Sequence, residues 1–316
     1  MKLVILDSET VTRNDVSLDG ITSLGEASVY GYTPNDEVAA RIGDADAVIC
    51  NKCLITKEVF DACPNLKYVG LFATGYNNVD LDAARAHGAA VCNVPNYSTD
   101  AVAQHTFALI LEFYNKTAEY TASVAHGDWV NYKLFTYFGI PTYELAGKTL
   151  GIVGYGAIGR KTAQIAGAFG MEVVTHTRSP RKVTDGTPCL SLEELLRRSD
   201  IVSLHCPLTP ENTKMINPQT LALMKPSALL INTARGGLVD EEALTDALNS
   251  GRIAGAGIDT LTFEPMREDC PLRKAKNCLM TPHIAWAPRE TRERLLEKVA
   301  ENLRAWRDGS PINTVN

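Results

Sequence analysis

The sequence has no long apolar run. A membrane-spanning helix needs about 18 consecutive apolar residues, and no segment approaches that length. Its first apolar run, Leu3–Leu6, stops at Asp7, too early for the apolar core of a secretory signal peptide. The 31 Lys and Arg residues form no basic cluster and are outnumbered by 37 Asp and Glu, for a net charge of −6. This balance argues against nucleic acid or an anionic membrane as a partner. We expect a cytoplasmic protein.

Low-complexity tracts are also missing, and the hydrophobic fraction of 45% and charged fraction of 22% are typical of folded domains. The length of 316 residues favours two domains. Eight cysteines fit a reducing compartment if they are buried thiols. Cys50 and Cys53 form C-x-x-C, a spacing used in redox sites and zinc sites. No second C-x-x-C or H-x3-H follows, so we interpret them as buried thiols and predict no metal site.

Short apolar runs alternate with helical patterns along most of the chain, which indicates parallel sheets connected by crossover helices. We predict one strand series at 2–7, 28–33, 47–50, 67–73 and 90–94. A second series follows at 149–154, 172–176, 201–206, 228–234, 254–259 and 279–284. The fold class is therefore α/β, with two Rossmann-like parallel-sheet domains. We expect the first domain to be discontinuous and flavodoxin-like, made of 1–98 and 288–316, and the second to be 99–287.

Two long helices frame the second series. The segment 99–115 is apolar on more than one face, so we expect it to lie between domains or between subunits. The segment 289–306 is amphipathic, and we expect it to pack back onto the first domain. Shorter helices carry start signals at their N-termini: a Ser191-x-x-Glu194 capping box, Asn217 before a proline, and Asp240.

A glycine motif of the form G-x-G-x-x-G directly follows a predicted strand and opens a predicted helix. Gly154 permits the tight turn, Gly156 lets the backbone approach a pyrophosphate, and Gly159 lets helix and strand pack closely. The free amides of the helix N-terminus attract phosphate groups. The alternative is a glycine-rich turn without a ligand. We expect a dinucleotide to contact Gly154, Tyr155, Gly156, Ala157, Ile158 and Gly159.

The acidic residue that binds the ribose 2′-hydroxyl in NAD sites is missing at the end of the next strand. Thr177, Arg178 and Ser179 stand there instead, with Arg181 nearby. A guanidinium is a better partner for the 2′-phosphate of NADP(H) than for the 2′-hydroxyl of NAD(H). NADP(H) is therefore the favoured cofactor, and NAD(H) is the alternative. The alternative is that Arg178, Arg181 and Lys182 form a solvated basic loop.

Ligands of open α/β sheets bind beyond the carboxyl ends of the strands, and four chemically useful side chains are expected there. Arg235 can bind the carboxylate of a 2-oxo acid through its planar charged fork. His283 can donate a proton to the ketone oxygen near neutral pH, with Glu264 as its carboxylate partner. Asp259 can hold the nicotinamide carboxamide or support the pair. Their joint placement predicts a dehydrogenase acting on a 2-hydroxy acid.

The sequence resembles the D-isomer-specific 2-hydroxyacid dehydrogenases over nearly its whole length. The resemblance lies in Gly154–Gly159, Leu230-Ile-Asn-Thr-Ala-Arg235-Gly-Gly, Gly257-Ile-Asp259 with Glu264-Pro, Thr281-Pro-His283-Ile-Ala, Gly75-Tyr-Asn-Asn-Val-Asp80 and Asn93-Val-Pro-Asn-Tyr-Ser. It implies two α/β domains with the active site in a cleft between them, usually in a homodimer held by the helix near 99–115. It also implies that Arg235 binds the substrate carboxylate and that Glu264 and His283 are the acid–base pair.

The same resemblance extends the expected contacts. For the cofactor it adds His205, Cys206, Pro207, Thr233, Ala234, Asp259, His283 and Ala285. For the substrate it adds Lys52, Cys53, Leu54, Thr74 and Gly75. Phe135, Phe138 and Trp286 either line the cleft or fill the domain interface. Gln104 departs from the family, in which many members have glutamate.

Within the family, Ile284-Ala-Trp286-Ala and Lys133-Leu-Phe-Thr-Tyr-Phe138 look most like glycerate dehydrogenases, also called hydroxypyruvate reductases. The resemblance therefore predicts reduction of hydroxypyruvate or glyoxylate to the D-2-hydroxy acid. Phosphoglycerate dehydrogenase is an alternative, because Lys52 could meet a phosphate, and so is a D-lactate-type enzyme. A dinucleotide-sensing, corepressor-like binding protein is a further alternative. The retained Arg235, Glu264 and His283 argue against it.

Overall fold

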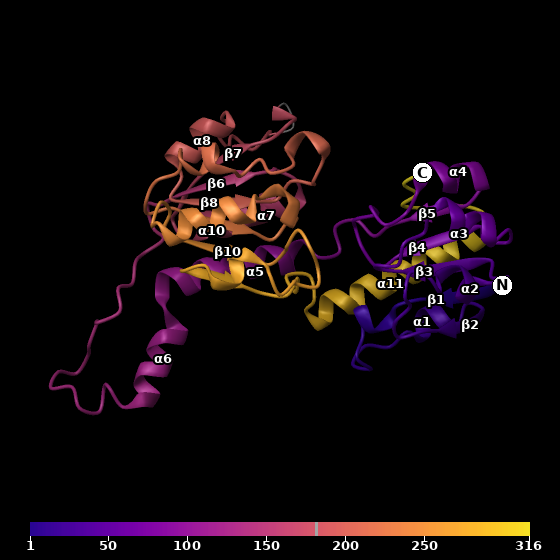
Figure 1. Cartoon of the computed structure of the whole chain (residues 1–316), viewed down its shortest axis with the longest axis horizontal. Coiled ribbons are helices and arrows are strands. Elements are labelled where there is room, and N and C mark those ends of the chain that lie inside the picture. Colours follow the sequence, from indigo (N-terminus) through magenta and orange to yellow (C-terminus); the bar gives the residue numbers. More distant parts are fainter. Residues whose placement is uncertain (181–182) are drawn as a thin grey trace. The chain divides into compact units, whose positions relative to one another are not determined.

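The computed structural model describes residues 1–180 and 183–316. These residues form two compact units, Met1–Ser98 with Trp286–Asn316, and Thr99–Ala285. Each unit is built on a parallel sheet with helices packed against it (Figure 1). The predicted class, α/β with two parallel-sheet domains, is therefore confirmed. The chain passes from the second unit back to the first between Ala285 and Trp286, whereas the sequence led us to expect this boundary at 287–288.

The sheet of the first unit has the order β2-β1-β3-β4-β5, and all its neighbouring strands are parallel. Strands β3 and β4 are buried at every residue, as expected for uninterrupted apolar runs inside a parallel sheet. Four helices connect the strands. The elements are β1 (Lys2–Ile5), α1 (Asp19–Thr22), β2 (Glu26–Val29), α2 (Val38–Ile42), β3 (Ala47–Cys50), α3 (Lys57–Ala62), β4 (Tyr68–Leu71), α4 (Leu81–His87) and β5 (Ala90–Cys92).

The prediction of a strand over 28–33 was wrong in its boundaries. β2 pairs with β1 from Glu26, opposite Lys2, to Val29, opposite Ile5. β1 ends at Ile5, and beyond it the carbonyls of Tyr30 and Gly31 accept the amides of Ser8 and Glu9 instead of continuing the strand ladder. The apolar residues after Val29 form a loop, and the position of a Cβ on Gly31 would lie 2.7 Å from Glu9 Oε1.

The helix α11 (Arg289–Arg307) belongs to the first unit, where it contacts α1 and β4. Its Leu295, Val299 and Leu303 are buried in one cluster with Leu3 and Tyr68. The amphipathic pattern of 289–306 thus corresponds to a helix with one face against the first sheet. The first unit is assembled from two segments that are distant in the sequence.

The sheet of the second unit has the order β11-β10-β9-β8-β6-β7, again with parallel neighbours. The helix starts predicted at Ser191, Asn217 and Asp240 are confirmed, because each side chain accepts a backbone amide of its helix. The elements are β6 (Thr149–Val153), α7 (Ala157–Ala168), β7 (Glu172–His176), α8 (Leu192–Arg198), β8 (Ile201–Leu204), α9 (Pro218–Leu221), β9 (Leu229–Asn232), α10 (Glu241–Asn249), β10 (Gly255–Ile258) and β11 (Cys278–Met280).

The helix α5 (Thr99–Asn115) buries its apolar residues inside the second unit itself. It packs on α7, β9 and β10, and Phe107, Ile110 and Phe113 belong to the cluster around Leu150 and Ile231. Its two apolar faces therefore already have partners in its own unit. None of the helices in the described part of the chain is both long and apolar enough to cross a membrane.

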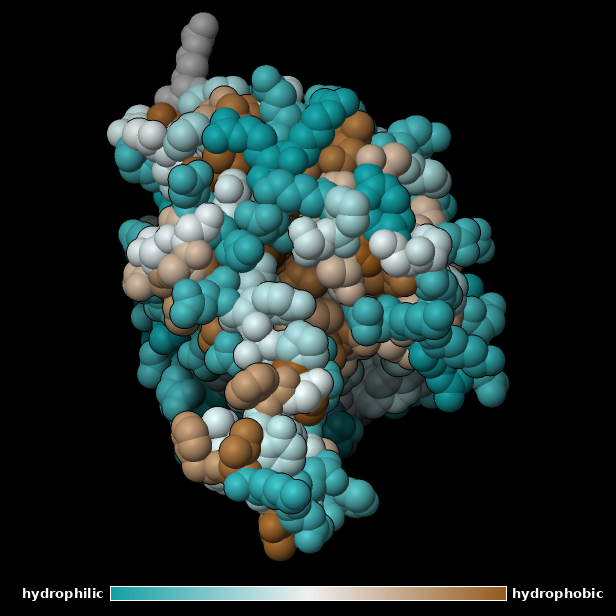
Figure 2. Space-filling view, turned by 90° about the vertical axis from the view of Figure 1, so that its left-hand side faces the viewer, coloured by the Kyte–Doolittle hydropathy of each residue, from teal (hydrophilic) through white to brown (hydrophobic). Residues whose placement is uncertain are grey.

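Residues 117–143, which we call the arm, extend out from the rest of the second unit after α5 and return where the Tyr143 amide donates to the Tyr114 carbonyl at 2.9 Å. The arm begins with α6 (Thr117–His126), which has no buried residue and extends away from the sheet of this unit (Figure 1). Figure 2 shows hydrophobic and hydrophilic side chains side by side on the face that includes the arm. The exposed large apolar side chains of the arm are Val124, Trp129, Val130, Tyr132, Leu134, Phe135, Phe138 and Tyr143.

Candidate active site

The glycine motif forms the turn between β6 and α7. Gly154 has φ +98°, and a Cβ there would lie 2.5 Å from the Cys206 amide nitrogen. A Cβ on Gly159 would lie 2.3 Å from the Gly154 carbonyl oxygen, whereas a Cβ on Gly156 would meet nothing within 4 Å. Among the described residues no side chain caps α7, so the N-terminus of this helix can bind an external anion. These residues fit a dinucleotide pyrophosphate.

The side chain of Tyr155, within the glycine motif, is held by residues at the C-terminal end of the loop that follows β7. Its hydroxyl donates to Asp185 Oδ2 at 2.9 Å and lies 2.8 Å from Thr187 Oγ1. Asp185 also pairs with Arg160 at 3.3 Å. Burial raises the pKa of Tyr155, so the phenol stays protonated and can serve as a donor. These contacts hold the glycine turn to the loop that begins at Thr177.

Three residues expected at the 2′-position of the cofactor directly follow β7. Thr177 Oγ1 accepts the Ser179 amide at 3.4 Å, and Arg178 is exposed. The pKa of the Glu211 carboxyl is lowered mainly by its hydrogen bond from the Thr209 hydroxyl, and to a smaller extent by the charge of Arg178. No carboxylate side chain occupies the position of Thr177. Arg181 and Lys182, the rest of the predicted basic loop, lie outside the described residues.

His205, Cys206 and Pro207 follow β8 and lie beside the glycine turn. The packing of Gly154 against His205 and Cys206 brings the two strand ends together. Burial lowers the pKa of His205 from 6.5 to about 4, so its ring is neutral at neutral pH. Its Nε2 lies 2.9 Å from Ser203 Oγ. Burial raises the pKa of the Cys206 thiol, which makes it a poor nucleophile.

Arg235 follows β9 in a turn that Asn232 braces. The Asn232 side chain accepts the Ala234 amide at 3.0 Å and donates to the Arg235 carbonyl at 2.9 Å. Thr233 is buried, and its hydroxyl lies 3.2 Å from that of Thr106. The Arg235 side chain is exposed, and its guanidinium donates to the Ala234 carbonyl at 2.7 Å. A carboxylate could therefore reach its remaining N–H groups.

Gly236 brings the Arg235 turn against the loop after β10. A Cβ on Gly236 would lie only 1.9 Å from the Leu261 carbonyl carbon and 2.3 Å from the Thr262 amide nitrogen. Only glycine allows this approach. In the same loop, Glu264 Oε1 accepts the Leu261 amide at 2.9 Å, which fixes the direction of its carboxylate.

Glu264 and His283 form a contact pair. His283 Nδ1 lies 2.6 Å from Glu264 Oε2, and both side chains are about a third exposed, at 27% and 30%. The pairing of Nδ1 leaves Nε2 of the ring directed away from the carboxylate and available to another molecule. An imidazole oriented by a carboxylate, with one nitrogen accessible, is the arrangement of a general acid–base catalyst.

Asp259 contacts the backbone next to His283. Its carboxylate accepts the amides of Ile284 at 2.9 Å and Ala285 at 3.0 Å, and the hydroxyl of Thr281 at 2.6 Å. Of the two roles expected for Asp259, support of the acid–base pair therefore has direct contacts in the structure. These contacts join the end of β10 to the segment after β11.

The expected substrate residues Lys52, Cys53 and Leu54 lie in the first unit, just after β3. Asp7, which follows β1, accepts the amides of Asn51 at 2.8 Å, Lys52 at 2.7 Å and Cys53 at 3.4 Å. The desolvation of this buried carboxyl raises the pKa of Asp7. With its amides held inward, the loop exposes the Lys52 and Leu54 side chains.

Thr74 and Gly75 follow β4 in the same unit. The Thr74 hydroxyl donates to the Val94 carbonyl at 2.7 Å, and Asn93 Nδ2 donates to the Thr74 carbonyl at 2.7 Å. In the described chain the amides of Thr74 and Gly75 have no hydrogen-bond acceptor. Trp286, also in this unit, packs edge-on against Tyr97, with ring centroids 6.4 Å apart.

The expected active-site residues therefore fall into two groups. The glycine turn, the residues after β7 and β8, Arg235, Glu264 and His283 belong to the second unit, and the expected substrate loops belong to the first. Phe135 and Phe138, expected in a cleft or a domain interface, are 89% and 81% exposed on the arm.

Cys50 and Cys53 are buried free thiols. Within the described residues, no three His, Cys, Asp or Glu side chains are grouped to hold a metal ion.

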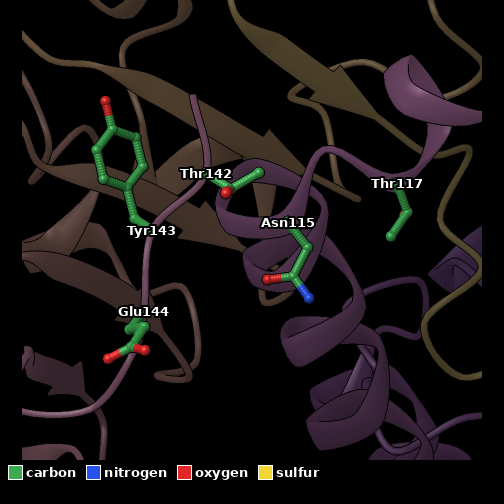
Figure 3. A pocket seen from close by; sticks show the side chains of 5 residues that line it. All are labelled: Asn115, Thr117, Thr142, Tyr143 and Glu144. Atoms are coloured by element: carbon green, nitrogen blue, oxygen red, sulfur yellow. The ribbon is translucent and has the colours of Figure 1, made fainter. Parts of the chain in front are cut away.

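A pocket of the second unit lies apart from these residues. It is lined by Asn115 at the end of α5, Thr117 at the start of α6, and Thr142, Tyr143 and Glu144 on the returning chain (Figure 3). None of the five is a catalytic or binding candidate. The pocket marks the base of the arm.

Sequence reasoning missed several residues that hold the candidates in place. Asp7 is the last residue of the strand predicted at 2–7, so the rule used for Arg235 could have found it. Asn232 is inside a quoted motif, and Thr281 is two residues before His283. His105 and Asp185 had no local signal, because their contacts join segments far apart in the sequence.

Comparison with known proteins places these motifs in a wider context. Residues 107–285 match the family described as D-isomer specific 2-hydroxyacid dehydrogenase, NAD binding domain. The chain is 42% identical to a hydroxypyruvate reductase of Blautia hydrogenotrophica over 100% of both chains. It is 39% identical to a glycerate dehydrogenase of Methylorubrum extorquens over 99% of this chain and 98% of that protein.

One similar solved structure contains a bound cofactor. It is an NADPH-dependent glyoxylate/hydroxypyruvate reductase of Sinorhizobium meliloti in complex with NADP and malonate. Its TM-score is 0.85 at 29% sequence identity, with 99% of this chain and 96% of that chain covered. Each of these proteins is similar to the chain over nearly its full length.

Proposed function

The chain belongs to the D-isomer-specific 2-hydroxyacid dehydrogenase family, and on this basis we propose that it reduces hydroxypyruvate or glyoxylate to the D-2-hydroxy acid. The observation that carries the proposal is the His283–Glu264 pair, 2.6 Å apart. Gly236 packs the Arg235 turn against the loop that bears Glu264. A proton donor and a carboxylate-binding cation are the two groups that a small 2-oxo acid requires.

The cofactor is a nicotinamide dinucleotide, which when bound in reduced form supplies the hydride to C2 of the substrate. The turn Gly154–Gly159 would hold its pyrophosphate at the N-terminus of α7. The residues after β7 and β8, together with Thr233, Ala234 and Ala285, would hold the rest. Asp259, whose side chain has no solvent exposure, would act through the Ala285 amide that it holds. The open space at Gly156 supports this assignment, because a Cβ there would meet no protein atom within 4 Å and this side of the turn is open to a ligand.

The protein's own residues bind the substrate and supply the proton. Arg235 binds the substrate carboxylate through two parallel N–H bonds and so orients C2. Nε2 of His283 donates its proton to the ketone oxygen, which becomes the hydroxyl of the product. Glu264 holds Nδ1 and stabilises the charged imidazole before this transfer. In the reverse reaction the same nitrogen takes the hydroxyl proton back.

The substrate loops of the first unit complete the proposal. The amides of Thr74 and Gly75 are donors without an acceptor in the described chain, and they suit a carboxylate. Lys52 and Leu54 expose their side chains from a loop that Asp7 holds. We assign Lys52, Cys53, Leu54 and Trp286 to the surroundings of the substituent on C2.

Initial rates on hydroxypyruvate, glyoxylate and pyruvate, each with NADPH and NADH, test the activity. We expect turnover of hydroxypyruvate and glyoxylate, followed as loss of reduced-cofactor absorbance. Preference for pyruvate would favour the D-lactate-type reading. Turnover of 3-phosphohydroxypyruvate alone would favour phosphoglycerate dehydrogenase. Dinucleotide binding without turnover of any acid would overturn the proposal in favour of a sensor.

We also propose that NADP(H) is the preferred cofactor. Thr177 lacks the charge that would repel a 2′-phosphate, and Arg178 is exposed beside it. The variant Thr177→Asp with Arg178→Ala should raise the ratio of kcat/KM for NADH over NADPH by about 10² or more, since one charged contact is lost and one repulsion is added. An unchanged ratio would assign Arg178 to a solvated surface.

Two further proposals concern the quaternary structure and the location of the protein. We propose a homodimer, and we assign its contact to the arm because the apolar faces of α5 are already buried. We propose a cytoplasmic location, supported by eight cysteines that are all free. Cell fractionation tests the location, and recovery of the protein outside the cytoplasm would contradict it.

A further inference from the structure

His283 has an unusual backbone conformation. Its φ is +56°, in the left-handed region that non-glycine residues rarely occupy. Such conformations persist only where the surrounding structure holds them, and they are frequent at active sites. The contacts that hold His283 therefore also determine where its ring meets Glu264.

Asp259 provides these contacts with both its backbone and its side chain. Its carbonyl accepts the His283 amide at 2.8 Å. Its Oδ1 accepts the Ile284 amide and its Oδ2 accepts the Ala285 amide. One residue thus holds three consecutive amides, starting at the residue with the left-handed backbone.

The Asp259 carboxylate is itself held by a chain of two hydrogen bonds. Its side chain has no solvent exposure. Thr281 Oγ1 lies 2.6 Å from Asp259 Oδ1 and 2.9 Å from Nε2 of His105 on α5. A carboxylate only accepts, so the Thr281 hydroxyl donates to Asp259 and must accept from His105. This order places a proton on Nε2 of His105.

We propose that Thr281 and His105 are positioning residues for the acid–base pair. They act through Asp259: the His105 N–H orients the Thr281 hydroxyl and also lies 3.6 Å from Asp259 Oδ1, and the hydroxyl orients the carboxylate that holds residues 283–285. Neither residue contacts Glu264 or the ring of His283 in the described chain. The inference rests on the proposed reduction, because it concerns residues that would position His283, the proposed proton donor.

Two threonines allow a matched test. Thr281→Val removes the hydroxyl and keeps the shape of the side chain, and Thr281→Ser keeps the hydroxyl. Thr260, next to Asp259, is also buried, but its hydroxyl has no hydrogen-bond partner in the described chain. Thr260→Val therefore removes a buried hydroxyl of the same loop region without breaking a contact.

The measurement is kcat and KM for hydroxypyruvate with the reduced dinucleotide, in each purified full-length variant. We expect Thr281→Val to lower kcat by about 10- to 100-fold, because a displacement of about 1 Å at the proton donor is enough for such a loss. Thr281→Ser should recover most of it, and Thr260→Val should match the wild type. The dissociation constant of the dinucleotide, from the fluorescence of the bound reduced form, identifies any loss of the cofactor site.

His105 is tested by a double-mutant cycle. His105→Phe should lower kcat in the same direction, and its effect should be smaller in the Thr281→Val background, because only the direct approach of Nε2 to Asp259 Oδ1, at 3.6 Å, is then left to lose. Equal kcat in Thr281→Val and Thr260→Val would overturn the inference, and so would independent losses in the cycle. Full activity of His283→Ala would instead overturn the proposed function, so the two failures are distinguishable.

Discussion

At the scale of single residues, the Arg235 and His283 side chains perform different tasks and should fail differently. Arg235→Ala removes the guanidinium that binds the substrate carboxylate. It should lower kcat/KM by about 10²–10³, mostly because the 2-oxo acid binds more weakly. His283→Ala removes the proton donor and should lower kcat by about 10²–10⁴. Initial-rate kinetics measure both losses, and dinucleotide binding should be unchanged in each variant.

Exposed residues of the same kinds serve as controls for these two variants. Arg197→Ala, on α8, and His126→Ala, on the arm, remove the same side chains from exposed positions. Both should have wild-type kinetics. If Arg235→Ala behaved like Arg197→Ala, the assigned role in carboxylate binding would be wrong.

His205 gives stability a defined pH dependence. Burial lowers the pKa of His205 from 6.5 to about 4, so between these values the unfolded chain binds a proton that the folded chain does not. The free energy of unfolding should therefore fall as the pH falls from 6.5 towards 4. This group contributes on the order of 2 kcal/mol, reduced because the ring keeps some exposure.

The variant His205→Gln isolates this contribution. Urea unfolding at pH 7 and at pH 4.5 should show a smaller acid-induced loss of stability in His205→Gln than in the wild type. His126→Gln is the control, because Asp128 raises the pKa of the exposed His126 and the sign of its effect is opposite. Equal acid-induced losses in the wild type and His205→Gln would contradict the prediction.

At the scale of elements, the site depends on two loops that touch at Gly236. A Cβ there would lie 1.9 Å from the Leu261 carbonyl carbon, so Gly236→Ala must separate the Arg235 turn from the loop with Glu264. We expect a loss of about 1–3 kcal/mol in stability and a fall in kcat/KM larger than the fall in folded fraction. Thermal unfolding and kinetics measure the two effects.

Gly167, inside α7, provides the matched control for this substitution. A Cβ on Gly167 meets nothing within 4 Å. Gly167→Ala should therefore stabilise the helix by up to about 1 kcal/mol and leave catalysis unchanged. Activity of Gly236→Ala at the wild-type level would show that the approach of the two loops is not required.

The conformation of the loop after β3 depends on the carboxylate of Asp7, which accepts the loop amides. Asp7→Asn replaces an acceptor oxygen by a donor that faces the amides of Asn51–Cys53, so the loop must move. We expect KM for the 2-oxo acid to rise about tenfold with unchanged dinucleotide affinity. Asp46→Asn is the control, because Asp46 accepts the Lys2 amide at the opposite end of the same sheet. An unchanged KM would remove Lys52 and Leu54 from the substrate site.

At the scale of the whole molecule, the arm is the largest group of exposed apolar side chains that the described residues present. Phe135 and Phe138 are 89% and 81% exposed, which suits burial against a second copy. We expect a dimer in sedimentation equilibrium and a monomer for Phe135→Ser with Phe138→Ser. Tyr32→Ser, which removes an exposed aromatic from the first unit, should stay dimeric. A monomeric wild type would contradict the assignment.

The local features of the fold were predictable from the sequence. The alternation of apolar runs and helical patterns identified the strands of both sheets, and Ser191, Asn217 and Asp240 marked helix starts. Such signals are local, because a cap or a strand is defined by a few consecutive residues. The boundary of β2 was less predictable, because the strand ends where its partner β1 ends rather than where the apolar run does.

From the sequence alone we could identify the family, the glycine turn, and the arginine, glutamate and histidine that we place in the reaction. The sequence also predicted Glu264 as the partner of His283, and the two side chains are 2.6 Å apart. The folded chain was needed to find that the Asp259 carboxylate holds the backbone next to His283, and that Thr281 and His105 contact this carboxylate. The physical reason is distance along the chain. A side chain's type is visible in the sequence, but its partner depends on how the strand ends meet in the sheet.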